Sequence, residues 1–286
     1  MRPLDKQMPP VWEAYPDGQR VPTGVANNHL LDAVGEYCSY CEMRLGGGAI
    51  LHHKLQREMP ESVPKEDWRH LLLICYDCRR HMTEDALTPD RLDDYLWPDA
   101  HPSFSLHADS PFRYRLKPVP YVITDEDGSR EEHDEEFVFV EVNPEAGAEL
   151  RRKAANTIEL FKLNSPYYDD SRHILEVPRS DHLQVLCNRL QQRTQAWTRA
   201  QASVSRVRQM RELPEVRENP DLEQLLHQQI THTAHGKGNW SVWMTVFWQE
   251  LEEKDVLERI FLEMPEDNPG FHFAGTHFGQ LRWEAL

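Results

Sequence analysis

The stretches Cys38-Ser-Tyr-Cys41 and Cys75-Tyr-Asp-Cys78 decide the fold of the first half of this chain. Each is a Cys-x2-Cys pair, and two such pairs are the usual sequence form of a structural zinc site with four thiolate ligands. We therefore predict that these four cysteines bind one Zn2+ ion. A disulfide pairing is the alternative, but nothing in the chain indicates an oxidising compartment. The fifth cysteine, Cys187, lies in an apolar-periodic stretch and is predicted to be a buried free thiol.

A histidine pair, His52-His53, lies between the two cysteine pairs on a predicted strand that begins at Ala49. Adjacent residues of a strand point to opposite sides, so the pair can supply both a metal ligand and a general base only if the strand bends locally. Histidine suits the role of a base because its pKa lies near working pH. The apolar run 71–74 leads into the second cysteine pair, and a helix is predicted to open after Cys78.

Length and apolar content limit the class of protein. The 286 residues leave room for two or three domains. The first residues contain no apolar segment of the kind that begins a secretory signal. The longest apolar clusters, 71–74 and 242–248, are too short to span a bilayer. We therefore expect a soluble cytoplasmic protein with no membrane partner.

The net charge of −16 argues against a free-standing, nonspecific nucleic-acid binder. The charge is unevenly distributed, because residues 121–150 carry eleven acids and one base, whereas residues 151–211 carry twelve bases and five acids. Residues 212–286 are again acidic, with fourteen acids and five bases. Only the middle segment can present a basic face to phosphates, so we expect another component to help deliver a nucleic-acid substrate.

The order of the predicted elements indicates an α+β protein. Residues 1–34 are rich in Pro, Gly and Asn, which predicts an irregular arm with a short helix over 30–34. Prolines recur through 86–118, where extended loops are expected. The four predicted regions are an N-terminal arm (1–34), a zinc-bound module (35–100), a loop and β-hairpin insert (101–148) and a mostly helical, partner-binding region (149–286).

Two periodicities predict the hairpin and the helices. The strand-like runs 119–124 and 136–142 are joined by a polar stretch at 125–128, which is typical of a hairpin. The acid run 131–136 is expected to be a solvated loop. Arg193 interrupts the apolar seam of the longest predicted helix; that seam is interpreted as core packing, with docking of a partner helix as the alternative. Helical spacing predicts helices over 150–161, 183–207, 221–230 and 240–261.

Three strings around the cysteine pairs form one larger pattern. They are Cys38-Ser-Tyr-Cys41-Glu42, Ile50-Leu-His-His53-Lys54 and Trp68-Arg-His70-Leu-Leu-Leu-Ile-Cys75-Tyr-Asp-Cys78. The pattern resembles that of zinc-knuckle HNH endonucleases, which commonly show Cys-x-Tyr-Cys-Glu, an acid-His pair, Trp-x-Asn-Leu and a closing Cys-x2-Cys-Asn. The resemblance implies a zinc-stabilised ββα (His-Me finger) module that hydrolyses nucleic acid, with DNA as the expected substrate. In such a site a histidine deprotonates water, and a divalent cation bridges the scissile phosphate and the leaving oxygen.

A second string lies on a predicted helix, Ala155-Asn-Thr-Ile-Glu-Leu-Phe-Lys-Leu-Asn164, and is followed by Arg172. It is similar to the helical signature of the Septu-type antiphage HNH subunit. That subunit is associated with an ABC-like ATPase, including in some retron systems. The combined resemblance covers about residues 35–185. It implies an effector nuclease of antiphage defence, with an ATPase that gates or delivers the substrate.

Carried over residue by residue, the resemblance implies roles for the histidines. His53 falls at the general base, and His52 falls where an acidic metal ligand is common, although a His-His pair also occurs in bacteriocin-type HNH nucleases. His70 stands in the place of the middle asparagine, which braces the catalytic loop. Arg79 occupies the position of the final metal-binding Asn or His, and arginine cannot ligate a cation. His81 is then the expected second ligand, with His52, of a catalytic Mg2+ or similar ion.

Other interpretations of the module stay open. Arg79 and Arg80 lie beside the expected cleft and are predicted to contact phosphate. One alternative is a zinc-ribbon adaptor whose nuclease site has decayed, in which His53 is a solvated polar residue, His70 caps a turn and His81 is exposed. The other is an RNA-directed nuclease, such as a tRNA-cleaving toxin, because HNH geometry alone does not distinguish the sugar.

Overall fold

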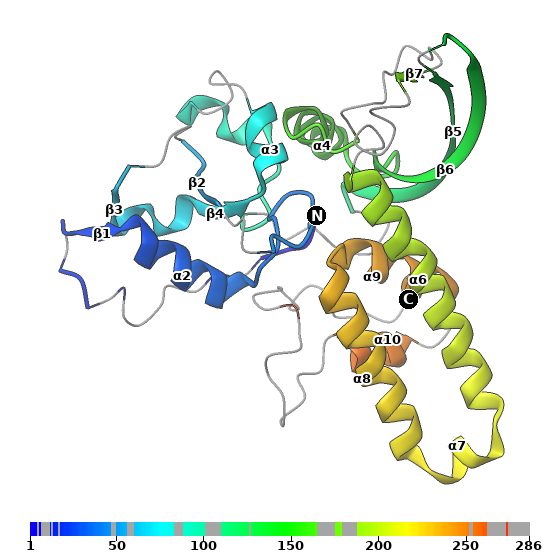
Figure 1. The fold of residues 1–286 in the computed structure, drawn as a ribbon. Helices are drawn as coiled ribbons and strands as arrows, with labels where there is room; N and C mark the ends of the chain where they lie inside the picture. The colour runs from blue at the N-terminus through cyan, green and yellow to red at the C-terminus, as the bar shows by residue number, and fades with distance from the viewer. Residues whose placement is uncertain are drawn as a thin grey trace.

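The computed structural model describes residues 1–4, 6, 12, 14–16, 18–46, 50–55, 60–82, 88–100, 110–125, 127–164, 175–178, 188–251, 254–261 and 273. Helices and three small β-sheets make up this part of the chain, in agreement with the predicted mixture of α and β structure (Figure 1). No helix within these ranges is both long and apolar enough to cross a bilayer. Cys187 lies outside the described residues, so the prediction of a buried thiol stays a prediction.

The N-terminal half is built around a ββα unit. Strand β2 (Ile50–His53) pairs antiparallel with β4 (Leu71–Ile74), so that His53 lies opposite Leu71. Helix α3 (Tyr76–His81) follows β4 directly and begins inside the second cysteine pair, earlier than the helix expected after Cys78, because the Cys75 sulfur caps its first turn. All four residues of β4 are buried, because helix α2 packs on this sheet. The remaining elements of this half are β1 (Arg20–Pro22), paired with β3 (Ser62–Pro64), and the 3-10 helix η1 (Lys65–His70).

The arm over residues 1–34 is more ordered than the sequence indicated. Helix α2 spans Thr23–Val34, whereas a short helix over 30–34 in an irregular arm was expected. Its buried side chains recur every four residues, at Ala26, Leu30 and Val34, and form one apolar stripe. The expectation was wrong because the polar residues of this segment face away from that stripe and mask its periodicity.

The predicted hairpin is confirmed, and its strands are longer than expected. Strand β5 (Phe112–Thr124) pairs antiparallel with β6 (Arg130–Val142) along its whole length, and β7 (Leu175–Pro178) pairs parallel with the end of β5. Two expectations are corrected, because β5 begins inside the region expected to be loops, and the acid run 131–136 lies in β6. The acids of this run that are described in full are exposed. A strand needs only its backbone pairing, so charge on both faces does not prevent it.

Two prolines in β5 explain why this strand was not recognised in full. Pro118 and Pro120 lie opposite Glu136 and Asp134, at positions where the β5 nitrogen points away from β6. On that other side β7 pairs with β5 only from Tyr121 onward. Neither proline therefore removes a hydrogen bond from the sheet, and both are tolerated in its middle strand.

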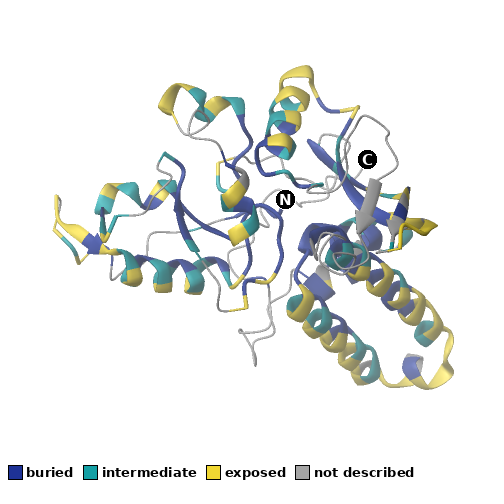
Figure 2. Ribbon diagram, turned by 45° about the horizontal axis from the view of Figure 1, so that its top comes forward, coloured by how far each residue is buried: buried dark blue, intermediate teal, exposed yellow. Residues whose placement is uncertain are grey.

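The C-terminal half is helical. Helices α6 and α8 form a long hairpin with α7 at its tip, and Figure 2 shows exposed positions along its outer sides. Helix α9 packs against α6, and its aromatic side chains Trp240, Trp243 and Phe247 are buried. The helices of this half are α4 (Ala148–Leu160), α6 (Asn188–Glu212), α7 (Pro214–Glu218), α8 (Pro220–Lys237), α9 (Trp240–Glu250) and α10 (Lys254–Phe261).

Arg193, the irregular position in the apolar seam of α6, has a structural role. Its buried guanidinium donates hydrogen bonds to the carbonyl oxygens of Val138 (3.1 Å) and Leu163 (3.0 Å). One turn earlier, Arg189 donates to the carbonyl oxygen of Phe161 at 2.8 Å. The two arginines therefore join α6 to β6 and to the turn after α4, where buried carbonyl groups need donors.

Glu42, which directly follows the first cysteine pair, joins the N-terminal half to α9. Its backbone has a positive φ of 63°. Its carboxylate accepts hydrogen bonds from the backbone nitrogen (2.7 Å) and the hydroxyl (2.6 Å) of Ser241, and its carbonyl oxygen accepts one from Asn239 at 2.9 Å. The Met1 ammonium lies 3.3 Å from the same carboxylate. The two halves therefore share one continuous core.

Candidate functional site

The two cysteine pairs come together at the edge of the ββα unit. In the first pair, the turn closes through hydrogen bonds from the Cys38 nitrogen to the Met43 oxygen (2.9 Å) and from the Glu42 nitrogen to the Cys38 oxygen (3.0 Å). In the second pair, Cys75 precedes α3, and its sulfur accepts a hydrogen bond from the Cys78 nitrogen at 3.4 Å. The four Sγ atoms lie within 4.8 Å of one another.

The geometry of these sulfurs fits a zinc ion. Four thiolates at Zn–S distances of about 2.3 Å in a tetrahedron lie about 3.8 Å apart. The Cys41 and Cys75 sulfurs are 3.7 Å apart, and three of the four cysteines are buried. Hydrogen bonds from the neighbouring thiols lower the pKa of Cys75, whereas burial raises the pKa of Cys78. Binding of an ion would release the protons of the remaining thiols. The predicted cysteine cluster is confirmed, and it can hold a structural metal such as zinc.

His52 points toward the first cysteine pair. Its Nδ1 lies 2.9 Å from the hydroxyl of Tyr40, whose ring stacks on Phe161 with centroids 3.7 Å apart. The side chain is buried, and its Nε2 has no hydrogen-bond partner among the described residues. Burial is the main cause that lowers the pKa of His52 to about 3, and the charges of Lys54 and Arg79 lower it further. His52 is therefore neutral at pH 7.

His53 lies on the other side of β2 and faces η1. Its Nε2 lies 3.3 Å from a carboxylate oxygen of Asp67, and its Nδ1 accepts a hydrogen bond from the Leu55 nitrogen at 3.1 Å. The proton of the neutral ring therefore resides on Nε2, toward Asp67. Burial lowers the pKa of His53, and Asp67 opposes that effect. The ring is thus neutral, with Asp67 at ion-pair distance from Nε2 but without a well-aligned hydrogen bond to it.

His70 and Arg69 complete this side of the unit. The rings of His53 and His70 have centroids 5.4 Å apart. The Arg69 Nε donates a hydrogen bond to the His70 Nε2 at 3.1 Å, and the Arg69 side chain is exposed. Sequence reasoning missed Asp67 and Arg69. The sequence feature that could have identified these two residues is their position just before the apolar run 71–74.

Two buried lysines anchor the backbone of η1. Lys6 and Lys54 share the carboxylate of Asp99, with nitrogen–oxygen distances of 2.6 Å and 2.5 Å. The Lys6 ammonium also donates to the carbonyl oxygens of Trp68 and Arg69 at 3.1 Å each, and Lys54 donates to that of Arg69 at 3.3 Å. Burial lowers the pKa of Lys6 to about 8. These contacts fix the main chain beneath Arg69.

The described residues neither support nor exclude the divalent ion expected at His52 and His81, so that site stays a prediction. Within the described ranges, the four cysteines are the only group of three or more His, Cys, Asp or Glu residues whose ligand atoms cluster. His52 and His53 have separate surroundings, and the charge of Arg79 acts on His52. The His81 side chain lies outside the described residues. Arg80, the other predicted phosphate contact, is exposed on α3.

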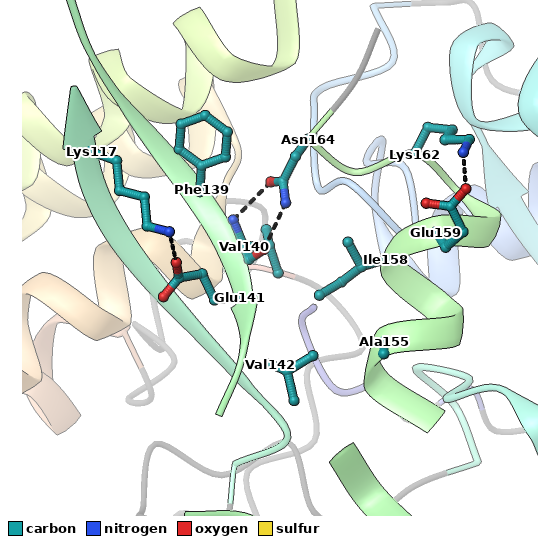
Figure 3. A pocket seen from close by; sticks show the side chains of 10 residues that line it. All are labelled: Lys117, Phe139, Val140, Glu141, Val142, Ala155, Ile158, Glu159, Lys162 and Asn164. Carbon is teal, nitrogen blue, oxygen red and sulfur yellow. Dashed lines mark hydrogen bonds and ion pairs between the residues drawn. The ribbon is translucent and has the colours of Figure 1, made fainter. Parts of the chain in front are cut away.

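A separate cavity of about 310 Å³ lies between β6 and α4, away from all the predicted site residues (Figure 3). Lys117 pairs with Glu141 on the sheet side, and Lys162 pairs with Glu159 on the helix side. At one end, the amide of Asn164 accepts a hydrogen bond from the Val140 nitrogen (2.9 Å) and donates one to the Val140 oxygen (2.8 Å). The charged groups of the walls are thus already paired.

Comparison with known proteins adds no family to this geometry. No protein-family model, no curated protein and no solved structure matches the chain. The resemblance to zinc-knuckle HNH endonucleases therefore remains a prediction, and the cysteine cluster of the ββα unit is the part of it that the structure confirms.

Proposed function

We propose that this chain is a zinc-stabilised endonuclease of HNH architecture that hydrolyses phosphodiester bonds of nucleic acid, with DNA as the first substrate to test. One observation carries the proposal: a ββα unit closed by four cysteines presents a carboxylate-held histidine, His53, at the end of its first strand. That histidine is the one at which the resemblance places the general base. Asp67 adds the orienting group that such a base needs.

The chemistry follows from the two nitrogens of His53. The Leu55 amide donates to Nδ1, so the ring proton is on Nε2, where the nearby Asp67 carboxylate favours it; Nδ1 is then the basic nitrogen once the Leu55 amide has moved away. Nδ1 then takes a proton from a water molecule, and the water oxygen forms a bond to phosphorus. One ester P–O bond breaks, and the leaving oxygen keeps the electron pair and takes a proton from solvent.

The zinc ion has a structural role in this proposal. Bound by Cys38 and Cys41 on one side and by Cys75 and Cys78 on the other, it would hold the first turn against the start of α3. The strand β4 and the residues of η1 before it are thereby fixed in the same unit as β2. Removal of the ion is expected to disturb the His53–Asp67 pair without any direct contact to it.

The biological setting rests on the second resemblance. We propose that the chain is the effector subunit of an antiphage complex with an ABC-like ATPase, which gates or delivers the substrate. The net charge of −16 supports such a dependence, because the subunit alone would bind nucleic acid poorly. In the helical signature, Phe161 stacks on Tyr40 and so connects α4 to the ββα half, and Asn164 pairs with Val140 of β6.

A zinc-ribbon adaptor is the second candidate, and one observation favours it. His52 and His53 are only 3% and 2% exposed, and the described residues assemble no second group of ion ligands. In an adaptor these histidines would be structural core residues. The Leu55 hydrogen bond to His53 would then be permanent rather than displaced by substrate.

Substitution of His53 separates the two candidates. The full chain and its His53→Gln variant would be incubated with plasmid DNA and with total RNA, with and without Mg2+, alone and with the ATPase. We expect cleavage by the parent chain and its near-complete loss in the variant, with unchanged zinc content and circular dichroism. His232→Ala, an exposed position on α8, is the matched control.

Equal cleavage by parent and variant, or none by either under every condition, would reject the nuclease. Absence of cleavage by both proteins, together with a stable complex with the ATPase, would support the adaptor. Cleavage of RNA alone would reassign the substrate.

A further inference from the structure

The end of η1 presents an exposed arginine on an unusually fixed backbone. Arg69 lies between Trp68, which is buried, and His70, which is half-buried, and its own side chain points to solvent. Its carbonyl oxygen accepts hydrogen bonds from two buried ammonium groups, Lys6 at 3.1 Å and Lys54 at 3.3 Å. An exposed guanidinium on so firmly held a main chain loses less entropy when it binds a ligand.

A hydrogen bond to His70 also fixes the orientation of the Arg69 side chain. Its Nε donates to the His70 Nε2 at 3.1 Å, which leaves the two terminal nitrogens of the guanidinium for another acceptor. In the described part of the chain no carboxylate pairs with it, since Asp67 lies against His53 and Asp99 lies between the two lysines. A guanidinium in this state matches the paired oxygens of a phosphodiester.

The local charge favours an anion. With the histidines neutral, Lys6, Lys54 and Arg69 carry three positive charges, and Asp67 and Asp99 carry two negative ones, which leaves one net positive charge. The whole chain carries −16, so this turn is a local exception to the repulsion that nucleic acid meets elsewhere.

We propose that Arg69, aligned by His70, is a phosphate-binding subsite for the nucleic-acid backbone. This inference rests on the proposed function in that the bound phosphate belongs to the strand cut at His53. His70 lies between the two residues, 5.4 Å from the ring of His53, so Arg69 holds the phosphate next to the scissile one. Arg69 acts by positioning the strand, and it has no part in moving protons.

Binding of a short fluorescent single-stranded DNA to the full chain tests the subsite. In the His53→Gln background, which prevents cutting, Arg69→Gln is expected to weaken binding about 5- to 10-fold. One lost phosphate contact should also reduce the slope of log K against log salt by about 0.7. Arg69→Lys should keep the salt slope and reduce the DNA affinity about 2- to 3-fold, because the charge stays and the planar fork of the guanidinium is lost. The control is Arg199→Gln, an exposed arginine of α6.

An oligonucleotide of the same sequence with an uncharged methylphosphonate backbone should bind equally well to the His53→Gln protein with and without Arg69→Gln. The proposal is overturned if Arg69→Gln leaves affinity and slope unchanged, if it weakens binding of the uncharged strand as much as that of DNA, or if Arg199→Gln reduces the slope as much. Absence of measurable DNA binding at about 50 mM salt would also overturn it. Failure of the proposed function looks different, since it appears as no cleavage by the parent chain while these binding differences persist.

Discussion

Replacement of Glu42 by Gln tests whether the association of the N-terminal half with α9 depends on one buried carboxylate. Burial raises the pKa of Glu42, but the Met1 ammonium and Ser241 more than offset it, so the pKa lies below its ordinary value and the group is charged at pH 7. Both carboxylate oxygens accept hydrogen bonds from Ser241, at 2.7 Å and 2.6 Å. The substitution keeps the shape of the side chain and removes its charge.

The magnitude follows from these two bonds. A hydrogen bond to a charged group contributes about 1.5–3 kcal/mol, and a neutral one contributes about 1 kcal/mol. The amide of Gln can keep both Ser241 contacts, because the Ser241 hydroxyl can turn to accept from its NH2 group, but both bonds become neutral and the pairing with the Met1 ammonium is lost. We expect Glu42→Gln to reduce the free energy of unfolding by about 3 kcal/mol, within the range measured for broken buried charge pairs.

Urea unfolding of the zinc-loaded chain measures this loss, read from the midpoint at an unchanged slope. In a double-mutant cycle with Ser241→Ala, the coupling energy should exceed about 1 kcal/mol, because the two residues touch. Glu132→Gln, an exposed position of β6, is the control and should change the free energy of unfolding by less than about 0.5 kcal/mol. A loss below about 1 kcal/mol with no coupling would refute the role given to Glu42.

Three further predictions concern other contacts. Cys75→Ser should weaken zinc binding more than about 100-fold, because even a residue that only hydrogen-bonds to a metal ligand contributes about 10- to 100-fold in metal affinity. Elemental analysis after dialysis checks this, and retained zinc would contradict it. Gly238→Ala should reduce the free energy of unfolding by at least about 2 kcal/mol, because its Cβ would lie 2.5 Å from the Glu42 carbonyl oxygen and the backbone φ is +70°. An unchanged melting temperature would contradict this close contact. Lowering the pH from 7 to 5 should reduce the free energy of unfolding by about 2 kcal/mol through His52. The pKa of this ring is near 6.5 in the unfolded chain and about 3 in the folded chain, so only the unfolded chain takes up the proton in this range. His52→Gln should abolish that part of the pH dependence in urea titrations, and an unchanged dependence would argue against the burial of this ring.

The cysteine cluster could be predicted because its chemistry is local. Two Cys-x2-Cys turns need little besides their own spacing to bring the sulfurs together, and the structure places them within 4.8 Å. The β-hairpin was also predictable, although its ends were not. Pro118 and the acids before Phe137 are poor strand formers on their own, and only their pairing with the partner strand keeps them extended.

The surroundings of His53 could not be predicted, because they come from segments far apart in the chain. Asp67 approaches the ring from η1, and the backbone beneath it is held by Lys6 near the N-terminus, whose ammonium pairs with Asp99. The role of Arg193 could not be predicted for the same reason. A charged residue in an apolar seam looked like an imperfection, but it supplies donors to carbonyl groups of two other segments.

The amide of Asn164 has a consequence for how this molecule meets its neighbours. β6 is the outer strand of its sheet, and the free edge of such a strand is a template onto which another polypeptide can add. Asn164 occupies the donor and the acceptor of Val140 on that edge, and Thr194 occupies the donor of Val138. Side chains thus imitate a missing strand there and protect the hairpin against edge-to-edge aggregation.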